Sequence, residues 1–228
     1  MITNLPVSDF SNKTGHVSFP ENSYESLLEL KLGYDNIFDF PSNGCFPSLK
    51  ILQVIAEHPD CEFLNRLFRS CPVLEELSIS GNLDLGDKHI FRISIPTLKR
   101  LHIDLYLEEL RYCSDHKFII QTPNLEYLFI LDASLACFEI DNIPSLLKAD
   151  VIIANSKYFN KVNAHRDRMT GILEGIRHAK DLTLAESTTA VSSLPYRIIL
   201  ISYLHSFHIM LFFCSFLFVN TSQFCLFI

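Results

Sequence analysis

A short phrase recurs along most of the chain: Leu, two residues, Leu, one residue, and then Leu, Ile or Val. The first leucines of six copies are separated by 22, 25, 24, 27 and 21 residues, and in five copies a proline stands two positions earlier. Such a period indicates a stack of small units, each of which buries its apolar face against its neighbours. The copies are Leu27-Leu30-Leu32, Leu49-Leu52-Val54, Leu74-Leu77-Ile79, Leu98-Leu101-Ile103, Leu125-Leu128-Ile130 and the degraded Leu146-Ala149-Val151.

Each copy has the pattern of a short strand that is buried on one face. Its apolar residues alternate with period two, and the proline before it stops a helix. Between copies some segments have helical spacing, as where Phe63, Leu64, Leu67 and Phe68 form one apolar stripe within residues 61–70. Strand and helix in alternation predict an α/β fold: a leucine-rich-repeat solenoid of about six repeats with parallel strands on its concave face. The array is irregular, because the asparagine that usually ends such a strand occurs in one copy only.

Composition and charge exclude several classes of protein. With 48% apolar and 20% charged residues, the chain is not intrinsically disordered. Its net charge of -7 provides no basic field for a nucleic acid, so no nucleic-acid partner is expected. The seven cysteines are scattered, with no two closer than ten positions, which is typical of reduced thiols in the cytoplasm or nucleus.

The sequence contains no arrangement of residues that is typical of catalysis. It lacks an HExxH pair, a phosphate-binding GxxxxGK[ST] loop and any closely spaced cysteine pair. Cys113 and His116 are close in sequence, but nucleophile and base normally come from distant positions. Gly171 and Gly175 form an isolated GxxxG. We therefore expect a protein that is not an enzyme and that needs no metal and no cofactor.

Several phrases resemble those of one family, the plant F-box/leucine-rich-repeat proteins, especially the group with an FBD module. They are CFPSLKIL at residues 45–52, SCPVLEEL at 70–77, TPNLEYL at 122–128 and GILEGI running into KDLTL at 171–184. The resemblance, which covers roughly residues 20–190, implies repeats that receive a substrate protein for a cullin ubiquitin ligase. Family members join a Skp-type adaptor through an N-terminal F-box. No F-box-like stretch precedes the repeats and no FBD module follows them here, so direct contact with such an adaptor is not expected.

The side chains between the buried leucines on the concave face are the candidate partner-binding site. By strand parity this face carries Glu29, Lys31, Ile51, Gln53, Lys148 and Asp150 besides six residues of the central repeats. Tyr127 and Phe129 are candidate anchors, because exposed aromatic residues contribute much of the energy of protein interfaces. The six central residues, which we predict to contact a protein partner, are Glu76, Ser78, Arg100, His102, Tyr127 and Phe129.

The C-terminal segment has a different composition. Arg197 is the last charged residue, and 22 of the 31 residues after it are apolar. Residues 198–219 are long enough, at about 1.5 Å per residue, to cross a membrane as a helix. We divide the chain into a lead-in segment at 1–20, the repeat region at 21–190 and a hydrophobic tail at 191–228.

Three interpretations of the tail stay open. We also expect a largely helical tail with few contacts to the strands, because its apolar residues do not follow the repeated phrase. The tail is a membrane anchor that displays the repeats to the cytosol, a cap on the end of the solenoid, or a segment foreign to the natural product. The third is favoured, because the family resemblance ends where the composition changes. The predicted function is a non-catalytic protein-binding module, with a tail-anchored membrane protein or a truncated fragment without independent function as alternatives.

Overall fold

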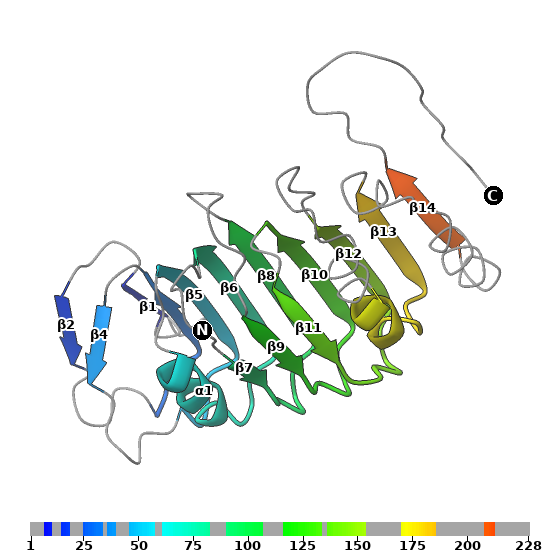
Figure 1. Cartoon of the computed structure of the whole chain (residues 1–228). Coiled ribbons are helices and arrows are strands. Elements are labelled where there is room, and N and C mark those ends of the chain that lie inside the picture. Colours follow the sequence, from blue (N-terminus) through cyan, green and yellow to red (C-terminus); the bar gives the residue numbers. More distant parts are fainter. Residues whose placement is uncertain are drawn as a thin grey trace.

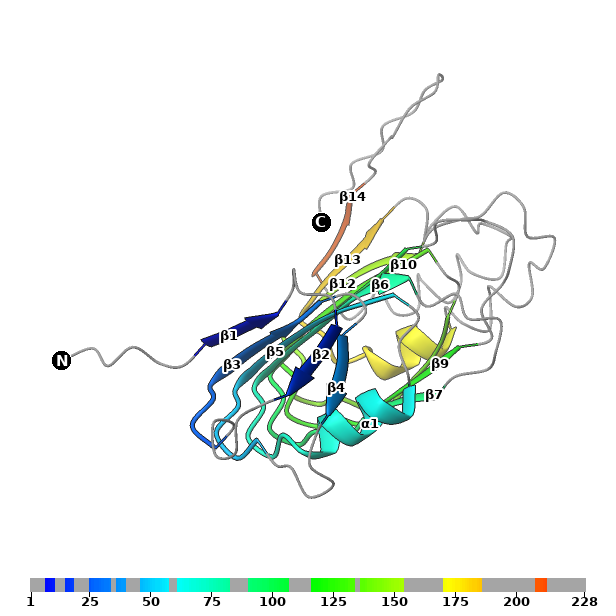
Figure 2. The same cartoon turned by 90° about the vertical axis from the view of Figure 1, so that its left-hand side faces the viewer.

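The computed structural model consists mainly of parallel strands, stacked side by side as the chain proceeds (Figure 1). Two sheets form the two sides of a flattened solenoid, with the apolar core between them (Figure 2). The structure describes residues 7–10, 15–18, 25–33, 36–39, 46–57, 61–82, 90–106, 116–133, 136–153, 170–185 and 208–212.

The larger sheet, called the main sheet below, has nine parallel strands among the described residues, in the order β1-β3-β5-β6-β8-β10-β12-β13-β14. From β5 to β13 each new strand is one repeat later in the sequence than its neighbour. The bounds are β1 Val7–Phe10, β3 Glu29–Leu32, β5 Ile51–Glu57, β6 Glu76–Asn82, β8 Arg100–Tyr106, β10 Tyr127–Asp132, β12 Lys148–Ile153, β13 Asp181–Ala185 and β14 His208–Phe212.

The leucines of the repeated phrase are aligned in the core of this sheet. Leu52, Leu77, Leu101 and Leu128 lie opposite one another in register, and each is at most 2% exposed. Each phrase therefore buries the same face of its strand, and the alternate residues point the other way. The prediction that five phrases form neighbouring parallel strands with their leucines buried is confirmed.

A proline-containing turn leads into each strand of the main sheet from β5 to β12. Before β8 the Leu98 amide donates to the Ile95 carbonyl at 3.2 Å, and the intervening proline has a φ angle suited to the second position of such a turn. The Lys99 and Arg100 amides then both donate to the Glu75 carbonyl of the previous repeat, at 2.8 and 3.0 Å. The same arrangement recurs from β3 to β13, so the hydrogen bonds between repeats extend beyond the strands.

The second sheet, which the sequence analysis did not predict, contains β7 (Ile90–Ile93), β9 (Lys117–Ile120) and β11 (Cys137–Ile140). Phe91, Phe118 and Phe138 stack along it inside the core, with ring centroids 4.9 and 5.2 Å apart. The expected alternation of strand and helix does not hold in these three repeats, where a second strand stands in the place of the helix. The reason is their Phe-x-Ile pattern, whose period of two buries a strand face and not a helix face.

Helices flank both edges of the second sheet. The predicted helix at residues 61–70 is confirmed as α1 (Cys61–Arg69), which buries Leu64, Leu67 and Phe68 and packs beside β7. A helical turn at residues 170–175 lies against β11.

The N-terminal segment contributes strands as well. β1 pairs with β3 of the main sheet, and β2 (Gly15–Ser18) pairs in parallel with β4 (Asn36–Asp39) as a separate ribbon. The lead-in segment predicted at residues 1–20 thus contains β1 and β2. The division of the chain into three parts stays a prediction.

The prediction of a helical tail with few contacts to the strands is wrong for the part of the tail that the structure describes. Residues 208–212 form β14, which pairs in parallel with all five residues of β13. The physical reason is that the last strand of a sheet has unpaired backbone groups along its edge, and another strand satisfies them. In the described part of the chain, no helix is long and apolar enough to span a membrane. The sequence analysis proposed residues 198–219 as a membrane-spanning segment. Apart from residues 208–212, that segment lies outside the described residues.

Candidate functional site

The six predicted site residues lie together on the face of the main sheet that points away from the second sheet. We call this side the open face and define it by the outward residues of β5, β6, β8, β10 and β12. Across the three central strands the residues form two rows in register, one nearer the turns and one further along the strands. The rows are Glu76–Arg100–Tyr127 and Ser78–His102–Phe129.

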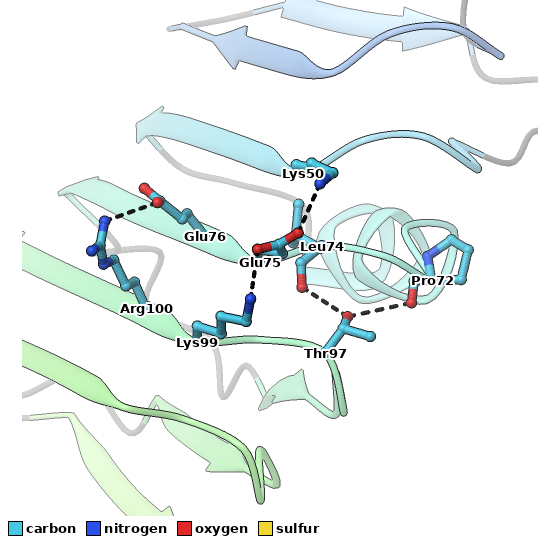
Figure 3. A network of polar contacts seen from close by, with 8 residues as sticks. All are labelled: Lys50, Pro72, Leu74, Glu75, Glu76, Thr97, Lys99 and Arg100. Atoms are coloured by element: carbon cyan, nitrogen blue, oxygen red, sulfur yellow. Dashed lines mark hydrogen bonds and ion pairs between the residues drawn. The ribbon is translucent and has the colours of Figure 1, made fainter. Parts of the chain in front are cut away.

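The row nearer the turns begins with an ion pair. The Arg100 guanidinium lies 3.0 Å from the Glu76 carboxylate, and both side chains are well exposed (Figure 3). Exposed pairs of this kind contribute little to stability, because water and salt screen their attraction. Their effect on the site is to neutralise both charges at this end of the open face.

Aromatic rings form the centre of the open face. His102 and Phe129 stack in parallel, with ring centroids 4.2 Å apart and planes 8° from parallel. Both side chains are partly buried, although they point out of the sheet. The stack connects β8 and β10, and it fixes the orientation of both rings before a partner arrives.

Beside this stack, Tyr127 belongs to a polar cluster with two residues of β12. Its hydroxyl donates to Oδ2 of Asp150 at 2.9 Å, and Lys148 Nζ lies 3.1 Å from the same oxygen and 5.7 Å from the centre of the Tyr127 ring. Burial of the phenol, together with the hydrogen bond and charge of Asp150, raises the pKa of Tyr127 to about 12. The phenol is therefore a neutral donor to Asp150 at any physiological pH.

The open face extends beyond the phrases that the sequence analysis used. Strands β6 and β8 continue to Asn82 and Tyr106, which adds a third outward row with Ser80, Asp104 and Leu131. The alternation of outward polar and inward apolar residues continues in β8 as Asp104-Leu105, and that signal could have identified the row. The sequence analysis assigned site residues only within the repeated phrase, because the residue types that follow the phrase differ from one repeat to the next.

A second group of polar contacts lies where the turns enter the strands. Glu75 is held between Lys50 and Lys99, at 3.0 and 2.9 Å, as Figure 3 shows. Hydrogen bonds from Lys99 and Lys50 lower the pKa of the Glu75 carboxyl, and the bond to Glu75 raises the pKa of Lys99. Each member of this ladder belongs to a different repeat, so the ladder connects three successive repeats at their turns.

The described residues contain no group of three side chains that could hold a metal ion. His116 is buried, and its ring meets that of Phe91 edge-on with ring centroids 6.2 Å apart, which is the environment of a core residue. Its neighbour in sequence, Cys113, lies outside the described residues. The side chains of the open face offer stacking, hydrogen bonding and ion pairing to another molecule.

Comparison with known proteins gives the family. A family model described as the LRR repeats of the FBD-associated F-box protein At5g56370 matches residues 12–148. Among relatives in Arabidopsis thaliana, the chain is similar to an FBD-associated F-box protein, At5g56390, with 37% identity over 55% of this chain and 30% of the relative. It is 29% identical to the F-box/FBD/LRR-repeat protein At5g22700, over 73% of this chain and 40% of the relative.

A third relative, the FBD-associated F-box protein At5g60610, is 30% identical over 80% of this chain and 44% of its own length. The chain thus spans less than half the length of these relatives. No solved structure matches it. The matched region contains the repeated phrases from β3 to β10, together with the turns and register described above. The chain belongs to the plant F-box/FBD/LRR family, through the leucine-rich repeats of that family.

Proposed function

We propose that this chain is a non-catalytic module that binds a protein partner on the open face of its repeats. The observation that carries the proposal is the pre-arranged centre of that face: the His102–Phe129 stack, with Tyr127 held by Asp150 beside it. Aromatic and arginine side chains contribute most of the energy at protein interfaces, and side chains that are already ordered lose less entropy on binding.

The residues around this centre support a protein partner over other ligands. The exposed pair of Glu76 and Arg100 lies at one side of it, and the pair of Lys148 and Asp150 lies at the other. An apolar and aromatic centre with a polar rim is the usual composition of a protein interface. These paired charges and the net charge of -7 disfavour a nucleic acid, whose phosphates need unpaired basic residues.

By resemblance to its family, we infer that the bound protein is a substrate of a ubiquitin ligase. We place the interaction in the cytoplasm or nucleus. The seven cysteines are scattered along the sequence, with no two closer than ten positions, and this pattern of reduced thiols supports a reducing compartment. A fluorescent fusion to the full chain, followed by fractionation, tests this location, and recovery in the membrane fraction would contradict it.

The proposed function is tested by affinity capture from plant extracts followed by mass spectrometry. The combined change Tyr127→Ala and Phe129→Ala should remove partners that the natural chain retains, while circular dichroism stays unchanged. The matched control is Ile90→Ala with Arg92→Ala, two exposed positions on the second sheet. Partners that are lost equally in the control, or only when the fold is lost, would contradict a site on the open face.

A further inference from the structure

Strand β6 carries two short side chains on the open face, between strands with longer ones. Ser78 lies in register between Gln53 of β5 and His102 of β8, and Ser80 lies between Ile55 and Asp104. Within the described residues, neither serine hydroxyl takes part in a hydrogen bond. A partner can therefore approach the sheet closely over β6 and find two hydroxyl groups available there.

The imidazole of His102 borders this strip. One face of the ring stacks on Phe129, which stands on β10, and the ring planes are nearly parallel. The opposite face of the imidazole is therefore directed toward β6, above the small side chain of Ser78. Because Phe129 already supports the first face, the second presents a flat surface of fixed orientation on which another planar group can stack.

Asp104 follows His102 on the same face of β8, about 6.6 Å further along the strand. The other carboxylates near the centre of the open face have cations beside them: Glu76 has Arg100, and Asp150 has Lys148. Among the described residues, Asp104 has no such cation. Its side chain is partly buried, so its negative charge is screened by water less than a fully exposed one would be.

We propose that the strip formed by Ser78, Ser80, His102 and Asp104 binds an arginine side chain of the protein partner. The guanidinium plane stacks on the imidazole of His102, its N–H groups donate to the Asp104 carboxylate, and the serine hydroxyl oxygens accept its remaining N–H groups. This inference rests on the proposed function and specifies the chemistry of the partner at that site.

Arginine satisfies these contacts better than the alternatives. The lysine ammonium is a compact charge that cannot stack flat on a ring, and citrulline has the shape of arginine without its charge. A phosphate group would be repelled by Asp104, which separates this strip from a nucleic-acid site. The strip is therefore selective for a group that is both planar and positively charged.

The inference is tested with a phage-displayed library of random short peptides, panned against the immobilised full chain. We expect the enriched peptides to share an arginine, and we expect replacement of that arginine by citrulline to weaken binding about ten-fold, the usual effect of a lost charged hydrogen bond. Asp104→Asn should weaken the arginine peptide by a similar factor and leave the citrulline peptide unaffected, because the two changes remove one interaction. The control Glu139→Gln, on the second sheet, should change nothing.

The outcomes separate this inference from the proposed function. Peptides that lose binding with Tyr127→Ala, but share no arginine and tolerate Asp104→Asn, would overturn the arginine site and leave the open face as the binding surface. A library that yields no peptide whose binding depends on any open-face residue would overturn both. The citrulline substitution changes only the peptide, so its result is independent of the folding of any variant.

Discussion

At the residue scale, the position between the proline and the first leucine of each phrase connects one repeat to the previous one. Thr97 Oγ1 donates to the carbonyl groups of Pro72 at 3.3 Å and Leu74 at 2.8 Å (Figure 3). Ser145 makes the equivalent contacts to Pro123 and Leu125, and Asn124 donates to Pro96. A polar side chain here supplies a hydrogen bond that the turn backbone does not make by itself.

Val73 stands at this position in one repeat, is 36% exposed and has no polar group. We expect Val73→Thr to raise the free energy of unfolding by about 0.5–1.5 kcal/mol, because its hydroxyl would donate to the turn carbonyls of the previous repeat. Thr97→Val should lower it by a similar amount. Urea denaturation measures both as shifts of the midpoint at constant slope. Val73→Ala is the control, and equal midpoints for the threonine and alanine variants would contradict the expectation.

The second prediction at this scale concerns Tyr127 and alkaline pH. Its pKa is raised from 10.0 to about 12, so the folded chain holds the phenol proton more tightly than the unfolded chain does. The stabilisation is complete below about pH 10 and is lost as the pH rises toward 12. The natural chain should therefore lose more stability than Tyr127→Phe between these limits. Denaturation midpoints of both chains against pH measure this, and parallel profiles would refute it.

At the scale of elements, the side chain of Asn65 on α1 makes hydrogen bonds to the free edge of β7, as a neighbouring strand would. Its side-chain amide donates to the Ile90 carbonyl at 2.8 Å, and its carbonyl oxygen accepts from the Arg92 amide at 2.6 Å. These are two of the backbone groups that β7 presents at its edge. The amide of one side chain thus satisfies part of the edge of the second sheet, which hinders pairing with another molecule there.

We expect Asn65→Asp to weaken this edge, since a carboxylate can accept from Arg92 but cannot donate to Ile90. The change should lower the free energy of unfolding by about 1–3 kcal/mol. The Ile90 carbonyl oxygen loses its hydrogen-bond donor, and the negative charge of the new carboxylate lies close to that oxygen. Hydrogen exchange should accelerate at Arg92 and not in β8. Asn142→Asp makes the same chemical change at an exposed site, and an equal loss there would argue against a specific role of Asn65.

The opposite edge of the second sheet depends on two glycines. A Cβ atom at Gly175 would overlap Cβ of Ile140 and lie 2.8 Å from its carbonyl oxygen, and one at Gly171 would lie 2.9 Å from the Phe138 carbonyl oxygen. The GxxxG motif therefore permits close packing of a helical turn on β11.

Gly175→Ala should destabilise the chain by about 1–3 kcal/mol, because the added methyl group forces the helical turn away from β11. Gly171→Ala should cost less, since it creates a single close contact. The intrinsic preference of alanine for helices acts in the opposite direction, by about 1 kcal/mol. Thermal unfolding ranks the variants, with the exposed Glu174→Ala as control. A chain stabilised by Gly175→Ala would show that the helical turn moves without cost.

The main sheet could be predicted from the sequence because the same strand pattern recurs in each repeat. Leu77, Leu101 and Leu128, for example, occupy the same position of the repeated phrase. The sequence predicted α1 because the apolar residues from Phe63 to Phe68 have helical spacing and form one stripe. The second sheet was missed because each of its strands has four residues, too few to distinguish a strand from a helix by periodicity. The six site residues were placed on one face by parity alone. The contacts that Tyr127 and Lys148 make with Asp150 depend on the register between β10 and β12, which the residues of a single phrase do not determine.

At the scale of the whole molecule, the described part of each repeat makes its main contacts with the repeats beside it in the stack. The strongest connections run in sequence, from β5 to β6, β8, β10 and β12, through paired backbones, aligned leucines and the charged ladder at the turns. Stability in such an array is close to a sum of terms for each repeat and each junction. A change at one end should therefore affect the far repeats very little.

Because a change at one end should affect distant repeats little, the contribution of the C-terminal tail to the sheet can be measured by deleting it. Within the described residues β14 is the last strand of the main sheet, and it pairs only with β13. Deletion of residues 191–228 exposes the backbone groups of β13, so hydrogen exchange should accelerate at residues 181–185. Protection in β6 and β8 should not change, because three strands of the stack separate β8 from β14. Deletion of residues 213–228, which retains β14, is the matched control and should leave the exchange of β13 unchanged. Loss of protection throughout the sheet after the longer deletion would contradict this expectation, because it would make the tail part of the cooperative core.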